Sequence, residues 1–399
     1  MQQIIGKAFA VLSVCLATAS PLMAQSRGSV VDILKMVERN NLQLKAARSQ
    51  TEADKSGNLT ATNWADPEVE FGYLWGGPAS IGKRKDVSVS QSIDLATLGG
   101  QRKRLAKAQN LLEDYRYEVI RQAVLAQADK ALLALIYSNR KLDMQRERKE
   151  YAQIIMSCMQ RRLDAGEGNI LDLNQAKMNL TAEEAELARL ESEHMALQEE
   201  LNVLNGGQAV SVESAQFGEV VFPVNFDSWY SEVEAKIPAL DVTRQKTAVA
   251  ASQVAVVKAE GLPSLSVGYM GEFTRGERYQ GATIGLSIPL WSNRQKVRQA
   301  KLAAQSVGEQ AADVRLQYRS RLKALYLRAE GLHKTLDMYR QTQSSQKGFA
   351  SLRRALEAGE ISLTEYLVSI GTYNDFAGKV LQAEFEFQSA WADLHSVLL

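Results

Sequence analysis

The second half of this 399-residue sequence repeats its first half. The stretch DAGEGNILD at 164–172 returns as EAGEISLTE at 357–365. Further matches, offset by 194 to 196 residues, occur in the same order in both halves: Leu44 and Arg48 with Leu240 and Arg244, Pro67–Tyr73 with Pro263–Tyr269, Ser92–Leu95 with Ser287–Leu290, and Arg104 with Arg298. The preserved order indicates a tandem duplication. We expect a first repeat at 25–212 and a second at 213–399.

Each repeat contains one helical pattern that is too long for a compact globule. These patterns span about 99–163 and 293–357, and 65 helical residues would extend on the order of 100 Å. A shorter helix is expected before each of them, at roughly 30–60 and 229–260. Another helix is expected after each reversal, at about 170–204 and 362–397.

The last helix of the first repeat shows how these helices pack. From Leu173 to Leu204, ten positions with heptad spacing are apolar except for Glu183 and His194. A seam sustained over more than four heptads predicts a coiled coil. Its antiparallel partner is expected to be the long helix before the turn.

The two reversals, at 164–172 and 357–365, are expected to be the tips of helical hairpins. The first tip has Gly166 for a left-handed cap, Glu167 after it, Asn169 as an N-cap and Asp172 in the next helical turn. The second tip has the same residue types in the same roles: Gly359, Glu360, Ser362 and Glu365. Serine followed three residues later by glutamate also predicts a capping box.

Between its first helix and its long helix, each repeat has two segments that alternate with period two. They lie at about 67–75 and 86–95, and at 263–271 and 282–290. One face is apolar, and we expect it to face lipid: Val69, Phe71, Tyr73, Val87, Val89, Leu265, Val267, Tyr269, Ile284 and Leu286. The other face is small and polar. This pattern fits a membrane barrel with a wet lumen, and it would also fit a half-buried sheet in a soluble protein.

The N-terminal segment predicts export. Residues 1–24 combine Lys7, an apolar run and small residues up to Ala24, as in a cleaved signal peptide. After cleavage only Cys158 remains, so no intramolecular disulfide can form. No later apolar run approaches the roughly eighteen residues of a membrane helix, so a membrane span is expected to consist of strands.

Four strands per chain are too few to close a barrel, because about eight is the smallest number that works. A barrel must therefore be shared between subunits, with eight strands from a dimer, twelve from a trimer or sixteen from a tetramer. Side chains would fill an eight-stranded barrel, so a conducting pore favours three or more chains.

Charge and motif content argue against nucleic-acid binding and against enzymatic activity. The 47 lysines and arginines nearly cancel the 46 aspartates and glutamates, so no global attraction to nucleic acid is expected. The three histidines, His194, His333 and His395, are scattered along the helical patterns. No nucleophile elbow, metalloprotease motif, phosphate loop or paired-cysteine motif occurs. We therefore expect no catalytic site, no metal site and no cofactor.

The duplicated order of helix, strand pair, long helix, tip and helix resembles the TolC family of outer-membrane efflux proteins over roughly 30–397. These proteins are the exit ducts of tripartite efflux pumps. The resemblance implies a mainly α homotrimer with a small β part, in which a twelve-stranded transmembrane barrel in the outer membrane continues into a periplasmic helical tunnel. It further implies passive export of drugs, metal ions or other small molecules, handed over by an inner-membrane pump of the RND type.

The same resemblance implies roles for the tips. A periplasmic adaptor (membrane fusion) protein would dock on the turns around Gly166 and Gly359. The acids Asp172 and Glu365 would line the periplasmic gate. The alternative is that the chain is itself a periplasmic adaptor, although adaptors have one coiled-coil hairpin and several soluble β-domains.

The chain departs from the family pattern at the tips. Leu163 and Leu356 stand where the family usually has an aromatic residue, and Ile361 stands where some members have an arginine. The second acid is Glu365 rather than Asp, and Val368 replaces an acid often found three residues later. These departures argue against a gate locked by the family's ionic network.

Overall fold

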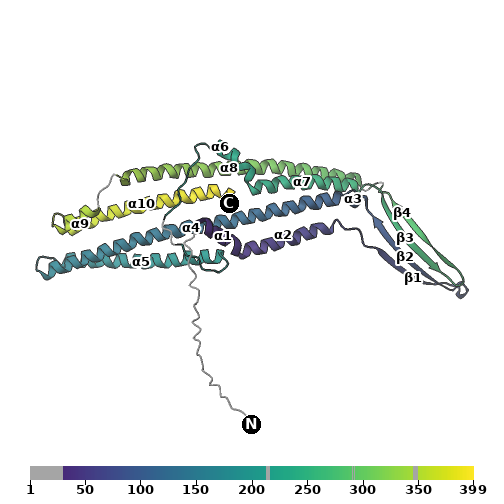
Figure 1. Ribbon diagram of the computed structural model, residues 1–399, viewed down its shortest axis with the longest axis horizontal. Helices are drawn as coiled ribbons and strands as arrows, with labels where there is room; N and C mark the ends of the chain where they lie inside the picture. Colours follow the sequence, from purple (N-terminus) through teal and green to yellow (C-terminus); the bar gives the residue numbers. More distant parts are fainter. Residues whose placement is uncertain (1–29, 213–215, 290, 292, 345–348) are drawn as a thin grey trace, which may run out of the picture.

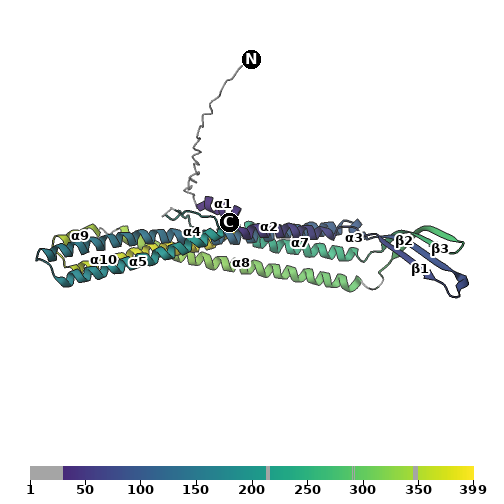
Figure 2. The same ribbon diagram turned by 90° about the horizontal axis from the view of Figure 1, so that it is seen from below.

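The computed structural model describes residues 30–212, 216–289, 291, 293–344 and 349–399. Its helices run along one long axis and its single sheet lies at one end (Figure 1). The view turned by 90° shows the same extended shape (Figure 2). The expected signal peptide, 1–24, lies outside the described residues.

None of the helices within the described ranges has the length and apolar composition needed to cross a membrane.

The elements up to residue 204 are α1 (Val30–Asn40), α2 (Leu42–Thr60), β1 (Glu68–Trp75), η1 (Ala79–Ile81), β2 (Lys83–Ile93), α3 (Leu95–Leu98), α4 (Gln101–Asp164) and α5 (Ile170–Leu204). The expectation of one helix over 30–60 is wrong, because the chain breaks at Asn41. The Asn41 side chain accepts a hydrogen bond from the Leu44 N–H at 3.0 Å and so caps α2. Its amide donates to the Leu204 carbonyl at 2.8 Å, which fixes the break against the end of α5.

The later elements are α6 (Phe226–Val233), η2 (Glu234–Lys236), α7 (Pro238–Ala259), β3 (Ser264–Phe273), β4 (Arg278–Ser287), α8 (Asn293–Ser344), α9 (Phe349–Glu357), α10 (Leu363–His395) and η3 (Ser396–Leu398). The helix expected over 229–260 is likewise divided, because Pro238 opens α7 and cannot donate a hydrogen bond to a preceding turn. The pattern at 293–357 contains two helices, and residues 345–348 between them lie outside the described part.

The coiled coil of α4 and α5 has the expected seam. All ten heptad positions from Leu173 to Leu204 are buried or half-buried. Both polar seam residues have partners across the hairpin. Gln145 Nε2 donates to the Glu183 carboxylate at 2.6 Å, and His194 Nδ1 lies 3.3 Å from Ser138 Oγ.

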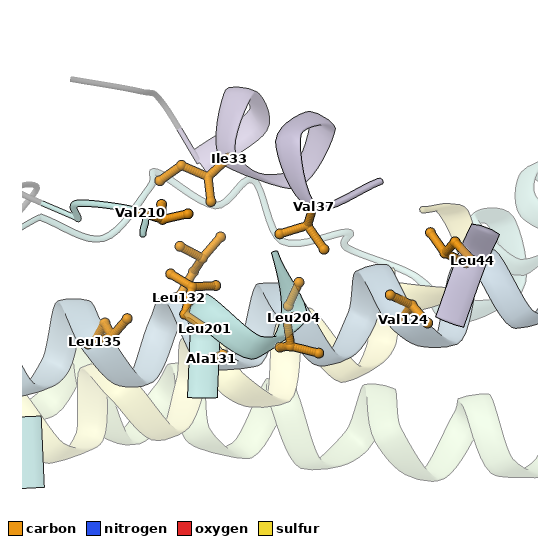
Figure 3. Close-up of a cluster of buried hydrophobic side chains, with 11 residues drawn as sticks. Ile33, Val37, Leu44, Val124, Ala131, Leu132, Leu135, Leu201, Leu204 and Val210 are labelled. Atoms are coloured by element: carbon orange, nitrogen blue, oxygen red, sulfur yellow. The ribbon is translucent and has the colours of Figure 1, made fainter. Parts of the chain in front are cut away.

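Two apolar cores hold the middle of the molecule together. The first joins α1, α2, α4 and α5, and fully buried Leu132 and Leu201 lie at its centre (Figure 3). The second joins α6, α7, α8, α10 and η3, and includes Ile237, Leu322 and Leu394. Each cluster packs a short helix, α1 or α6, against the long helices of its repeat, and so it fixes these helices relative to one another.

Helix α4 is the longest element, with 64 residues, which correspond to about 96 Å. It contacts α2 and α7 in the half near the sheet, and α5 and α10 in the half near the tips (Figure 1). The sheet and the tips are therefore connected by one continuous helix.

Candidate functional site

The four strands form one antiparallel sheet in the order β1-β2-β3-β4. Its register pairs Val69 with Val89, Val89 with Tyr269, and Val267 with Ile284. Because paired residues and alternate residues share a face, all ten residues expected to face lipid lie on the same side of the sheet. We call this side the apolar face.

The opposite side, which we call the polar face, carries small and charged residues. Serine, threonine and glycine dominate it: Gly72, Ser88, Ser90, Ser92, Ser264, Ser266, Gly268, Gly281, Thr283, Gly285 and Ser287. Near the strand-connecting loops, Arg84 lies 2.8 Å from Asp86 and 3.1 Å from Glu272. A sheet with one apolar and one polar face can lie between lipid and water.

None of the residues that the structure describes forms a layer over the apolar face. Val69 is 72% exposed, Phe71 66% and Ile284 78%. A contiguous exposed apolar surface of this kind marks contact with a membrane or with another protein. The strands β1 and β4 are also sheet edges with unpaired backbone groups, which favour pairing with further strands.

Both tips end their first helix with the same backbone motif. Gly166 and Gly359 have φ values of 76° and 75°, in the left-handed region that glycine adopts without steric cost. The Gly166 N–H donates to the Leu163 carbonyl at 3.0 Å, and the Glu167 N–H donates to Arg162 at 2.9 Å. The second tip repeats both bonds, with 3.1 Å from Gly359 to Leu356 and 2.9 Å from Glu360 to Ala355. These are two Schellman motifs.

The helices that follow the tips begin with different caps. The Asn169 side chain accepts a hydrogen bond from the Leu171 N–H at 3.0 Å. Ser362 and Glu365 form a full capping box, with 2.8 Å from the Ser362 N–H to the Glu365 carboxylate. This bond holds the pKa of Glu365 below its ordinary range, because it favours the ionised carboxylate.

The two acids at the tips are therefore in different environments. The Glu365 carboxylate is bound to the first turn of its own helix. The half-buried side chain of Asp172 makes no hydrogen bond or ion pair with any residue that the structure describes. Of the two acids at matching positions of the repeats, Glu365 is thus engaged in capping and Asp172 is available for other contacts.

The two hairpins pack against each other just behind the tips. Their common core comprises Ile155, Met159, Leu173 and Ala176 from the first hairpin and Leu356, Leu363, Tyr366 and Ile370 from the second. Leu356 is 4% exposed, and Leu163 and Ile361 lie at the edge of this core. Three of the residues that depart from the family pattern, Leu163, Leu356 and Ile361, are therefore apolar packing residues here.

The profile of the outer membrane efflux protein family matches residues 81–207 and 229–398, which together exceed half of the chain. The chain belongs to the outer membrane efflux protein family. This efflux protein is accordingly an outer-membrane channel protein rather than an enzyme, and the family assignment decides against the periplasmic adaptor.

Individual relatives agree with this assignment. The efflux protein is 24% identical, over 86% of its length and 77% of the relative's, to the pyoverdine export outer membrane protein OpmQ of Pseudomonas putida. Its fold is similar to the CmeC outer membrane channel of Campylobacter jejuni, with a TM-score of 0.72 and 16% identity, covering 92% of this chain and 85% of the other. The MtrE outer membrane channel of Neisseria gonorrhoeae is similar at a TM-score of 0.70 and 14% identity, covering 92% and 88%.

One charged site of the efflux protein was not expected from its sequence. Arg140 of α4 and Arg340 of α8 both contact the Glu384 carboxylate of α10, the second at 2.6 Å. Beside them, Arg148 donates to the Asn374 carbonyl at 2.9 Å. These residues line a groove of about 540 Å³ between α4, α8 and α10. Arg140 and Glu384 are 244 residues apart in the sequence, so no local sequence pattern could predict this site.

Proposed function

We propose that three copies of this chain form an outer-membrane exit duct. The observation that supports this proposal is the open four-stranded sheet, which has an apolar face, a polar face and two free edges. When β4 of one copy pairs with β1 of the next, a ring closes. Three copies give twelve strands, enough for a water-filled lumen.

In this arrangement the apolar face contacts the acyl chains of the outer membrane and the polar face lines the lumen. The helical rods then extend from the barrel into the periplasm as a tunnel wall. Their exposed apolar residues, such as Leu316 at 67% and Met178 at 67%, would be covered by neighbouring copies.

The tips lie at the end of the tunnel farthest from the sheet (Figure 1). There we propose that the turns at Gly166–Asn169 and Gly359–Ser362 dock a periplasmic adaptor, which connects the duct to an inner-membrane pump of the RND type. Asp172 and Glu365 would lie around the periplasmic mouth. The exported compound would pass from the pump or the periplasm to the outside through this passive duct.

Disulfide cross-linking across the proposed strand junction tests the assembly. In a Cys158→Ser background, Glu70→Cys on edge strand β1 is combined with Thr283→Cys on edge strand β4, both on the polar face. Oxidation in native membranes should give covalent ladders that end at three chains. Each single-cysteine variant should remain monomeric on a denaturing gel. A ladder ending at another number, or a folded monomer that needs no detergent, would refute the trimer.

A further inference from the structure

Charged residues of the sheet are segregated between its two faces. The strand residues Lys83, Lys85 and Arg278 lie on the apolar face, and none of the described strand residues on that face is acidic. The acidic strand residues all lie on the polar face: Glu68, Glu70, Asp86 and Glu272. The apolar face therefore carries a net positive charge, although most of its other strand residues are apolar.

The three cations are concentrated at one end of the sheet. Register places Tyr73, Lys85, Phe273 and Arg278 side by side in one row across all four strands. Lys83 pairs with Trp75 in the next row toward the β1–β2 loop. This end is the one farthest from the helices (Figure 1). We call these six residues the aromatic–cationic row.

Two of the three cations of the aromatic–cationic row contact rings rather than carboxylates. Lys83 Nζ lies 5.7 Å from the Tyr73 ring centroid, and the Arg278 guanidinium lies 5.9 Å from that of Phe273. Neither they nor Lys85 form an ion pair with any carboxylate in the described part of the chain. Arg84 on the polar face, in contrast, is bound by Asp86 and Glu272. The row thus has three cationic groups available for an anion.

The end of the apolar face nearer the helices has a different composition. Its outermost row consists of Ile93, Leu265 and Leu286, and Val69 of β1 lies two rows further in, paired with Val89. No cation belongs to this part of the face. The charge asymmetry distinguishes one membrane surface from the other.

We propose that the aromatic–cationic row binds the phosphate groups of lipid headgroups in the membrane leaflet at the loop end of the barrel. This inference rests on the proposed function, in which the apolar face lies against lipid. Aromatic side chains favour the membrane interface, and lysine and arginine extend their charges from apolar surroundings to the headgroups. Closure of β4 against β1 of the next copy would continue the alternation of rings and cations around the barrel.

The test compares two forms of one glycolipid. The purified full-length protein in detergent is titrated with lipid A bearing two phosphates and with its dephosphorylated form, and bound lipid is counted by native mass spectrometry. We expect the wild type to prefer the phosphorylated form by more than tenfold. Since each cation near an anionic lipid surface contributes about fivefold to binding, Lys83→Gln/Lys85→Gln/Arg278→Gln should weaken it on the order of 100-fold.

Two matched variants control for folding and for total charge. Arg294→Gln/Lys296→Gln/Arg298→Gln removes the same charge at the start of α8 and should bind lipid A as the wild type does. Lys83→Arg/Lys85→Arg/Arg278→Lys preserves the charge and should also bind normally. If the triple glutamine variant does not assemble, Lys85→Gln alone should still weaken binding about fivefold.

The outcomes separate this inference from the proposed function. Equal affinity for the two glycolipids, or equal losses in the row variant and the α8 variant, would overturn the role of the row while the barrel stands. A wild-type protein that forms no membrane-embedded oligomer would instead overturn the proposed function.

Discussion

The Glu365 carboxylate accepts a hydrogen bond from the Ser362 N–H at 2.8 Å, while Ser362 Oγ accepts one from the Glu365 N–H at 3.2 Å. The equivalent acid of the first tip, Asp172, has no such bond among the described residues. Duplication has therefore placed two acids at matching positions, and only one of them closes a capping box. The difference gives each acid its own expected behaviour.

The capping contribution of Glu365 should depend on pH. Because its pKa is lowered in the folded state, it stabilises the tip above the unfolded pKa of about 4.3, and this contribution is lost as the pH falls through the folded pKa. Amide hydrogen exchange at 362–366 should be slower in wild type than in Glu365→Gln at neutral pH. The difference should shrink steadily below about pH 4, and a constant difference would contradict the assignment.

Asp172 should influence ion selectivity more than Glu365 does. In a trimer, three free Asp172 carboxylates around the mouth would favour cations, as acidic rings do in cation channels. The Glu365 carboxylate is already hydrogen-bonded to its own helix. In planar bilayers, Asp172→Asn should therefore reduce cation selectivity and block by a trivalent cation more than Glu365→Gln. Unchanged selectivity and block in the double variant would leave both residues with capping roles alone.

Arginine should be tolerated differently at adjacent positions of β3. Val267 lies on the apolar face, so Val267→Arg should cost about 2–4 kcal/mol per chain near mid-membrane and reduce assembly in the outer membrane. Ser266→Arg, on the polar face, should assemble better and alter conductance. Heat-resistant oligomers on a gel and single-channel currents provide the two measurements. Equal assembly of both variants would mean that the two faces have been assigned wrongly.

The tip glycines should tolerate asparagine but not valine. Both adopt positive φ, where asparagine is accommodated and a branched side chain costs about 1–3 kcal/mol. Gly166→Val/Gly359→Val should abolish efflux, measured as dye accumulation, while trimers remain in the membrane. Gly166→Asn/Gly359→Asn should keep both the efflux activity and the trimers. Loss of the trimers in the valine variant would show that the glycines serve folding rather than docking.

A third tip glycine has no such tolerance. A Cβ at Gly168 would lie 2.6 Å from the Leu163 backbone nitrogen, so even alanine must displace the end of α4. The equivalent position in the second tip is Ile361, which packs against the shared core. Gly168→Ala should thus distort the first tip, whereas Ile361→Ala should only remove packing.

The polar pair in the coiled-coil seam should show strong coupling. Gln145 is 3% exposed and donates to Glu183, so Gln145→Leu should destabilise the hairpin by about 1–3 kcal/mol through the unpaired carboxylate. The double variant Gln145→Leu/Glu183→Leu should recover most of this loss in thermal unfolding. The exposed neighbour Glu184, 3.5 Å from Lys149, provides the control, because Glu184→Gln should cost less than about 1 kcal/mol. Additive effects of the two leucines would contradict the coupling.

Sequence periodicity predicted the features that depend on local pattern. The long helix expected at 99–163 is α4, Gln101–Asp164, and the heptad seam of α5 is buried or half-buried along its length. The ten apolar strand residues share one face because alternation is fixed by strand geometry alone. The capping box of Ser362 and Glu365 was also predicted, since its bonds are formed within a single turn.

Features that depend on distant partners were not predicted. The break at Asn41 is held by the Leu204 carbonyl, 163 residues away. Strand β2 begins at Lys83 rather than 86, because Lys83–Lys85 pair with Tyr73–Trp75 of β1. The contacts of Arg140 and Arg340 with Glu384 join three helices. In each case the deciding partner is brought near only by the completed fold.

The continuity of α4 also restricts how such a molecule can change size. Its two halves are packed against different helices, and the seam with α5 repeats every seven residues, or about 10 Å. An insertion in α4 alone would shift every seam position beyond it out of contact. Related proteins of different length must therefore differ by whole heptads, added together to α4, α5 and the corresponding helices of the second repeat. The length of the molecule can thus change only in discrete, coordinated steps.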